Sequence, residues 1–143
     1  MKVFLDTNVL VAAFATRGLC ADVLRLILVH HELVTSAVVV EELERVLSDK
    51  LRLPDDVVAR ARELLEAFMT PAAAGHEETP LSIRDESDVA VVRSALGAGV
   101  DVLVTGDRDL LEAEVPIRVL SPRAFWELLR AQSPSDEAHE GSL

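Results

Sequence analysis

The sequence predicts an α/β domain in which helices cover both faces of a parallel sheet. Short apolar stretches alternate with amphipathic helical segments along the whole chain, and such alternation is typical of parallel sheets with right-handed crossovers. Aromatic residues make up only 3% of the composition, so the core must be aliphatic, which favours buried parallel strands over an aromatic-rich sandwich. A length of 143 residues fits one domain with one core.

The first elements are short. Residues 2–5 form an apolar run that predicts a buried strand, and residues 8–15 predict a helix of two turns. Arg17 and Gly18 are expected to end this helix. Residues 20–30 carry apolar side chains at helical spacing and predict an amphipathic helix. Residues 32–35 predict the second strand.

Two longer helices and a loop are expected next. Ser36 is a favourable N-cap for a helix over residues 37–48, whose apolar positions recur at helical intervals. Pro54 and the two aspartates after it suit the first turn of a helix over residues 54–68. Residues 70–80 combine prolines, glycine and polar side chains, which predicts a loop.

The last part of the chain repeats the alternation. A capped helix is expected from residue 85 to Gly97 or Gly99, and a β-branched run over 100–107 predicts the third strand. The remaining expected elements are a short helix around 110–111, a fourth strand over 117–120, and a helix over 122–130 that Ser121 caps. The domain thus spans residues 1–132, and the acidic, polar tail over 133–143 is expected to be disordered.

Charge and cysteine content restrict the class of protein. A net charge of −11 argues against a nucleic-acid binder that depends on a broad basic surface, although divalent metals bound to gathered carboxylates reverse the local field. Cys20 is the only cysteine, which excludes an internal disulfide and a Cys-based zinc site. Asp6 and Asn8 interrupt the first apolar stretch too early for a signal peptide or membrane span. We expect a soluble cytoplasmic protein.

Two aspartates directly follow expected strands. Asp6 comes after the first strand, and Asp107 lies at the end of the third. In open parallel sheets, ligands bind beyond the carboxyl ends of the strands. An Asx-turn at Asp6 and a helix cap at Asp107 are the alternative interpretations of these residues.

Helical spacing directs two further carboxylates toward the interior. Glu42 lies three residues after Val39 and four before Val46, beside the apolar stripe of its helix. Asp88 shares a face with Val91, Val92 and Ala95, and Asp85 lies one turn earlier on that face. A carboxylate in an apolar stripe is unfavourable unless it is paired or coordinated. Capping remains the alternative role for Asp85.

These acids come from four separate elements and are expected to meet at one edge of the sheet: Asp6, Glu42, Asp88 and Asp107. Converging carboxylates repel one another, and no Lys or Arg in the apolar stripes could neutralise them. Bound divalent cations would resolve the repulsion. Oxygen-only ligation favours Mg²⁺ or Mn²⁺ over zinc, and none of the four histidines has metal-ligand spacing.

The motifs around these acids resemble those of a known family. They occur in this order along the chain: LDTNVL, SAVVVEELERVL, the D-x-x-D of RDESDVAVVRSAL, and VTGDRDLL. Together they resemble the PIN-domain nucleases, in particular the VapC-like toxins of toxin–antitoxin systems. The similarity covers about residues 1–130.

The resemblance implies a three-layer α/β/α sandwich and a metal-dependent endoribonuclease that uses Mg²⁺ or Mn²⁺. It carries the family's catalytic, metal-binding acids onto the four residues Asp6, Glu42, Asp88 and Asp107. It also implies supporting residues, which are Asn8, Thr105, Asp85 and Asp109. Arg17 and Arg108, expected in loops near the site, are candidate phosphate contacts. An RNA substrate, an antitoxin protein and a homodimer are the implied partners.

Other interpretations fit parts of the pattern. A PIN-like module could bind metal and a protein partner without cleaving RNA. Haloacid-dehalogenase-like phosphatases also place Asp after the first strand, but Asn8 stands here where they have an acid/base Asp. A receiver domain would need a late lysine, and none follows Lys50. The sequence does not distinguish RNA from single-stranded DNA, or one metal from two.

Overall fold

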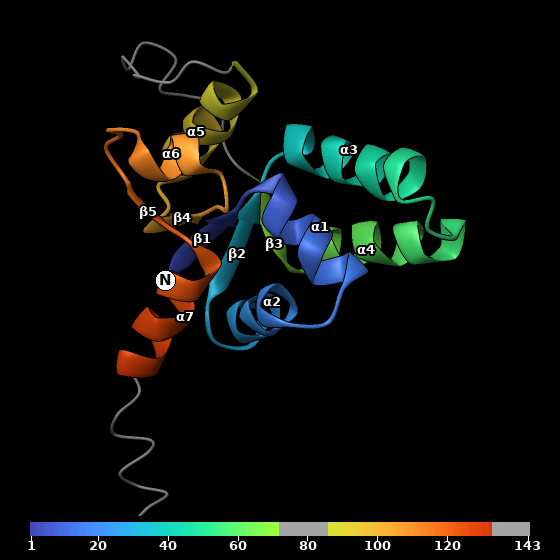
Figure 1. The fold of residues 1–143 in the computed structure, drawn as a ribbon, viewed down its shortest axis with the longest axis horizontal. Coiled ribbons are helices and arrows are strands. Elements are labelled where there is room, and N and C mark those ends of the chain that lie inside the picture. The colour runs from blue at the N-terminus through green and yellow to red at the C-terminus, as the bar shows by residue number, and fades with distance from the viewer. Residues whose placement is uncertain (72–85, 133–143) are drawn as a thin grey trace, which may run out of the picture.

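The computed structural model describes residues 1–71 and 86–132. Its centre is a five-stranded sheet in which every pair of neighbouring strands is parallel, in the order β3-β2-β1-β4-β5 (Figure 1). The strands are β1 (Lys2–Leu5), β2 (Glu32–Thr35), β3 (Met69–Pro71), β4 (Val102–Val104) and β5 (Arg118–Leu120). The chain builds outward from β1 to β3 and then returns to the other side of β1 with β4. The carboxyl ends of β1 and β4 therefore flank the switch point of the sheet.

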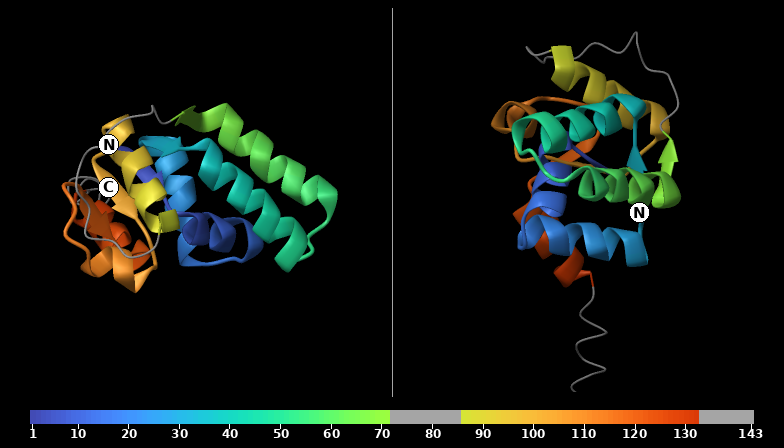
Figure 2. Two further views of the ribbon diagram at one scale, coloured as in Figure 1. Left: turned by 90° about the horizontal axis from the view of Figure 1, so that it is seen from above. Right: turned by 90° about the vertical axis from the view of Figure 1, so that its right-hand side faces the viewer.

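Helices cover both faces of this sheet, which confirms the three-layer α/β/α prediction. They are α1 (Thr7–Ala15), α2 (Leu19–His30), α3 (Ala37–Arg45), α4 (Asp55–Phe68), α5 (Glu86–Ala98), α6 (Arg108–Glu112) and α7 (Pro122–Ala131). The pair α5 and α6 lies on one side of the strands, and α2 and α7 lie on the other (Figures 1 and 2). Helix α3 packs against α4. None of the described helices is long and apolar enough to span a membrane.

Local signals set the helix ends as expected. The Ser36 hydroxyl accepts a hydrogen bond from the N–H of Val39 at 3.4 Å and caps α3. The Ser121 hydroxyl accepts one from Ala124 at 3.0 Å and caps α7. Helix α5 ends before Gly99, whose φ of +65° is a left-handed conformation that glycine adopts readily. These contacts satisfy backbone groups that the helix itself leaves unpaired.

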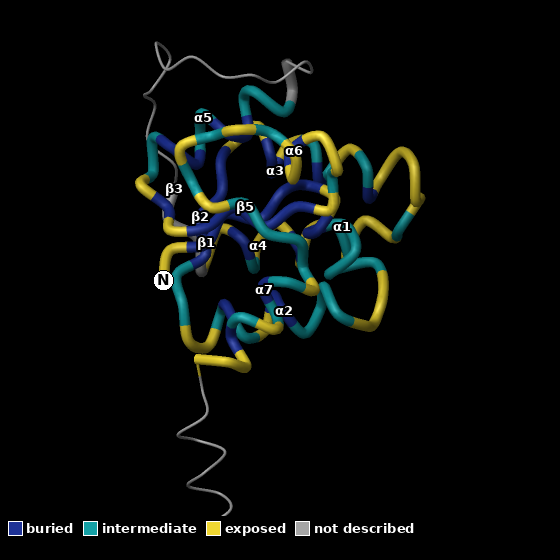
Figure 3. Tube along the Cα trace, turned by 60° about the vertical axis from the view of Figure 1, so that its left-hand side comes forward, coloured by how far each residue is buried: buried dark blue, intermediate teal, exposed yellow. Residues whose placement is uncertain are grey.

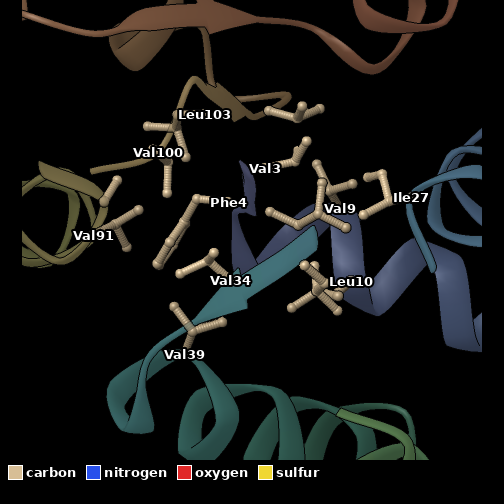
Figure 4. Close-up of a cluster of buried hydrophobic side chains, with 14 of the residues drawn as sticks. Val3, Phe4, Val9, Leu10, Ile27, Val34, Val39, Val91, Val100 and Leu103 are labelled. Carbon is tan, nitrogen blue, oxygen red and sulfur yellow. The ribbon is translucent and has the colours of Figure 1, made fainter. Parts of the chain in front are cut away.

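The core is aliphatic and centred on β1. Val3, Phe4 and Leu5 are completely buried, and buried segments run through the middle of the trace while exposed ones lie at its edge (Figure 3). Phe4 lies among valines that include Val91, and Val3 points toward Ile27 on the other side (Figure 4). Successive side chains of a strand face opposite sides of the sheet, so β1 packs against both helical layers.

Three expectations about secondary structure need correction. The loop expected over residues 70–80 begins with a strand, because β3 pairs Thr70 with Val34. The proline at the end of this short edge strand indicated a loop instead, since Pro cannot donate a hydrogen bond to a neighbouring strand. The third strand ends at Val104, before the expected limit of 107. The helix expected over 37–48 changes at Val46 into a π-helical turn, η1 (Val46–Lys50).

The expected disordered tail over 133–143 lies outside the described residues, as does most of the expected loop. The alternation of strands and helices is otherwise confirmed, with each described element within a few residues of its expected position.

Candidate active site

Asp6 stands at the carboxyl end of the central strand. Its backbone N–H donates to the carbonyl oxygen of Val104 at 3.0 Å, which extends the pairing of β1 with β4. Its carboxylate Oδ1 accepts a hydrogen bond from the N–H of Thr7 at 2.8 Å and caps α1. Asp6 is therefore a helix cap, where the sequence suggested an Asx-turn as its alternative role, and the same placement puts its carboxylate at the switch point of the sheet.

The residue that follows the neighbouring strand β4 contributes a hydroxyl that links two of the predicted acids. Thr105 is completely buried, and its Oγ1 donates to Oδ2 of Asp6 at 2.7 Å. The same oxygen accepts a hydrogen bond from the N–H of Asp107 at 3.0 Å. The Asp107 carboxylate accepts one from the N–H of Asp109 at 2.8 Å and caps α6. Thr105 thus fixes both the Asp6 carboxylate and the backbone that presents Asp107.

A second threonine links Asp6 to the acid on α3. The hydroxyl of Thr7 donates to Oε2 of Glu42 at 3.2 Å, and Glu42 is half-buried, as its place beside the apolar stripe predicts. Together these contacts form one chain of hydrogen bonds that we call the acidic relay: Glu42, Thr7, Asp6, Thr105 and Asp107. Three of the four predicted acids are therefore brought together by two threonines.

The acidic relay is electrostatically unfavourable without a cation. Asp6 is only 6% exposed, and this burial is the main reason that its pKa is raised above the usual value. Hydrogen bonds from Thr105 and Thr7 act in the opposite direction, and the negative charges of Glu42 and Asp107 raise the pKa further. Within the described residues, none of these three carboxylates forms an ion pair.

The chemistry of this donor set fits a hard divalent ion. All its side-chain groups are oxygens, and each carboxylate retains lone pairs beyond those used in the relay. In the described part of the chain, however, no three His, Cys, Asp or Glu side chains already form a group that could hold a metal. Metal binding would therefore draw the carboxylates closer than the relay places them.

The other predicted site residues lie at various distances from the relay. Asp88 is half-buried in the first turn of α5, whereas Asn8 on α1 and Asp109 on α6 are exposed. Asp85 lies outside the described residues. Arg108 follows Asp107 directly and is exposed, but it begins α6 instead of lying in a loop.

Arg17 is farther from the acids than its expected role suggests. It lies beyond the C-terminal end of α1, whereas Asp6 caps the N-terminal end. A helix of this length places the two about 15 Å apart along its axis. There the exposed Arg17 lines a cavity with Phe14 and Leu28.

The fold and the acidic relay together define an α/β/α protein with a carboxylate site at the switch point of a parallel sheet. A family model described as PIN domain matches residues 2–109. The chain therefore belongs to the PIN domain family, which sets aside the haloacid-dehalogenase-like and receiver alternatives.

A solved structure has the same fold. The crystal structure of VapBC2 from Rickettsia felis, bound to a DNA fragment from the promoter, matches with a TM-score of 0.63. The match covers 85% of this chain and 98% of that chain at 19% identity, so it supports the fold and not a shared activity. No curated protein matches this sequence.

Proposed function

We propose that this protein is a metal-dependent endoribonuclease that acts as the toxin of a toxin–antitoxin pair. The acidic relay is the observation that carries the proposal. Asp6 after β1, Glu42 on α3 and Asp107 at the start of α6 are linked through Thr7 and Thr105 at the edge where parallel sheets bind ligands. Membership in the PIN domain family supports the same activity.

Each relay residue has a distinct part in this proposal. Asp6 is the central ligand for Mg²⁺ or Mn²⁺, because it lies between the other two acids and is the most buried. Asp107 and Glu42 would supply further carboxylate ligands, and Asp88 on α5 would complete the set. Thr105 orients Asp6 through its hydroxyl. When bound, a divalent ion supplies an activated water and stabilises charge on the phosphodiester.

Substrate binding on so acidic a chain needs a local source of positive charge. The chain carries −11 overall, and bound divalent ions would invert the field at the relay. In this proposal Arg108, which is exposed beside Asp107, would contact a phosphate of the RNA.

The proposed protein partner is an antitoxin. The matching structure is named as VapBC2 bound to a DNA fragment from the promoter, and the family resemblance of this chain to VapC-like toxins leads us to propose an antitoxin partner for it. A basic or mixed-charge antitoxin segment would complement the charge of −11. We also propose that the chain forms a homodimer in the cytoplasm.

Cleavage of a mixed pool of structured RNAs tests the activity. Purified protein is incubated with Mg²⁺, Mn²⁺ or EDTA, together with Asp6→Asn and Asp88→Asn. Asp49→Asn makes the same chemical change at an exposed residue of η1 and serves as the matched control. The proposal predicts metal-dependent cleavage that both site variants abolish and the control retains.

Other outcomes separate the alternatives. Metal binding by calorimetry without cleavage of RNA or single-stranded DNA would refute the nuclease and support a non-catalytic PIN-like module. Equal trace cleavage by the wild type and by Asp6→Asn would assign that cleavage to a contaminant and refute the role of Asp6.

A further inference from the structure

Thr7 contacts two acids of the site at once. It is the first residue of α1 and is 3% exposed. Its backbone N–H donates to Oδ1 of Asp6 at 2.8 Å, and its hydroxyl donates to Oε2 of Glu42 at 3.2 Å. The two acids lie on different elements, so this one residue joins the end of β1 to the middle of α3.

The two contacts of Thr7 differ in what they depend on. The contact with Asp6 uses the backbone, so any residue except proline would preserve it. The contact with Glu42 uses the hydroxyl, so it depends on the side chain of residue 7. A valine at this position keeps the shape and the N–H but loses the hydroxyl. Thr7→Val therefore removes the contact with Glu42 and keeps the contact with Asp6.

Glu42 needs such a restraint more than Asp6 does. Asp6 accepts hydrogen bonds on both carboxylate oxygens, whereas the Thr7 hydroxyl supplies the one hydrogen bond to Glu42 within the described residues. Glu42 is also half-buried and has a longer side chain with more rotamers to lose on binding. One oxygen held by Thr7 leaves the other oxygen of the carboxylate for a ligand.

We propose that Thr7 is a positioning residue that orients Glu42 for binding the divalent ion. This inference rests on the proposed metal site, and it assigns a task to a side chain that does not itself need to touch the metal. Hydrogen bonds to ligating carboxylates raise metal affinity, and their loss typically weakens binding by 10–100-fold. We expect the smaller end of that range, about tenfold, because the contact is neutral on the threonine side and long at 3.2 Å.

Mn²⁺ binding by the full chain tests the proposal without reference to cleavage. The dissociation constant for Mn²⁺ is measured by calorimetry and by electron paramagnetic resonance for the wild type, Thr7→Val and Thr7→Ser. Thr7→Val is expected to raise the dissociation constant about tenfold, and Thr7→Ser, which restores the hydroxyl, is expected to bind nearly as the wild type does.

Thr35 offers a matched control for the loss of a buried hydroxyl. It ends the neighbouring strand β2, is completely buried, and its hydroxyl has no hydrogen-bond partner among the described residues. Thr35→Val therefore makes the same chemical change without removing a contact to an acid. Its Mn²⁺ affinity is expected to equal that of the wild type.

A double-mutant cycle shows whether Thr7 acts through Glu42. Glu42→Ala should weaken Mn²⁺ binding, and adding Thr7→Val to it should weaken binding no further. Unchanged or tighter binding by Thr7→Val, or an equal loss in the Glu42→Ala background, would overturn the positioning role. A wild type that binds no Mn²⁺ would instead refute the proposed metal site, and this inference with it.

Discussion

The same substitution at two equally buried threonines is expected to change stability in opposite directions. Thr105 and Thr35 are both completely buried. They lie at the carboxyl ends of β4 and β2, the two strands on either side of β1. The Thr105 hydroxyl donates to Asp6 and accepts from the N–H of Asp107, whereas that of Thr35 has no partner in the described part of the chain. Valine is close to threonine in shape, so Thr→Val isolates the hydroxyl.

The expected magnitudes follow from these contacts. A hydrogen bond to a charged group contributes about 1.5–3 kcal/mol, and one between neutral groups about 1 kcal/mol. Thr105→Val removes one of each, so we expect the free energy of unfolding to fall by about 3 kcal/mol. Thr35→Val removes a buried hydroxyl that has no hydrogen-bond partner among residues 1–71 and 86–132, so we expect a gain of about 1 kcal/mol. For a domain of this size, these changes correspond to a Tm lowered by about 10 °C and raised by about 3 °C.

Thermal unfolding followed by circular dichroism at pH 7 in EDTA measures both changes, and urea titration supplies the free energies independently. EDTA removes metals whose binding would mask the contribution of the hydroxyls. If both variants lost stability equally, the hydroxyl of Thr35 would have a partner and the distinction drawn between the two sites would be wrong. If Thr105→Val were as stable as the wild type, the hydrogen bonds of the acidic relay would contribute nothing to folding.

Three further changes test the electrostatics and the local structure. Burial raises the pKa of Asp6 in the folded state. The stability that Asp6 contributes is therefore present below its ordinary pKa of 3.8 and is lost as pH rises through its folded-state pKa. Asp6→Asn should unfold at a higher Tm than the wild type at pH 7 in EDTA, and this difference in Tm should shrink toward pH 4. Mn²⁺ should raise the Tm of the wild type and leave that of Asp6→Asn nearly unchanged, and a shift of equal size in both would argue against Asp6 as a ligand. Ser121→Ala removes the cap of α7 and should lower the free energy of unfolding by about 1 kcal/mol in urea titration, whereas no change would show that the cap is dispensable.

The acidic relay shows how capping and ligand binding can coexist in one residue. Asp6 and Asp107 both cap helices, yet each carboxylate has lone pairs beyond the one the cap uses. A local hydrogen bond to the backbone and a role as metal ligand, which the sequence offered as alternatives for these residues, are therefore compatible. A cap also fixes the carboxylate rotamer, and that benefits a metal site.

Most of the elements and part of the site can be predicted from local sequence signals. Hydrophobic periodicity and caps are local signals, so α3 with Ser36 and α7 with Ser121 follow from residues close together in the chain. The half-burial of Glu42 likewise follows from its spacing to Val39. By contrast, β3 has a weak local signal, and it forms because β2 offers it a free edge.

Which residues contact one another depends on how the elements pack. The order of strands puts β4 beside β1, which brings Thr105 within 2.7 Å of Asp6 across 99 positions of sequence. The packing of α1 on α3 brings Thr7 to Glu42 in the same way. Periodicity shows which face of an element is buried but not which element covers it, because that choice depends on packing free energy summed over the whole core.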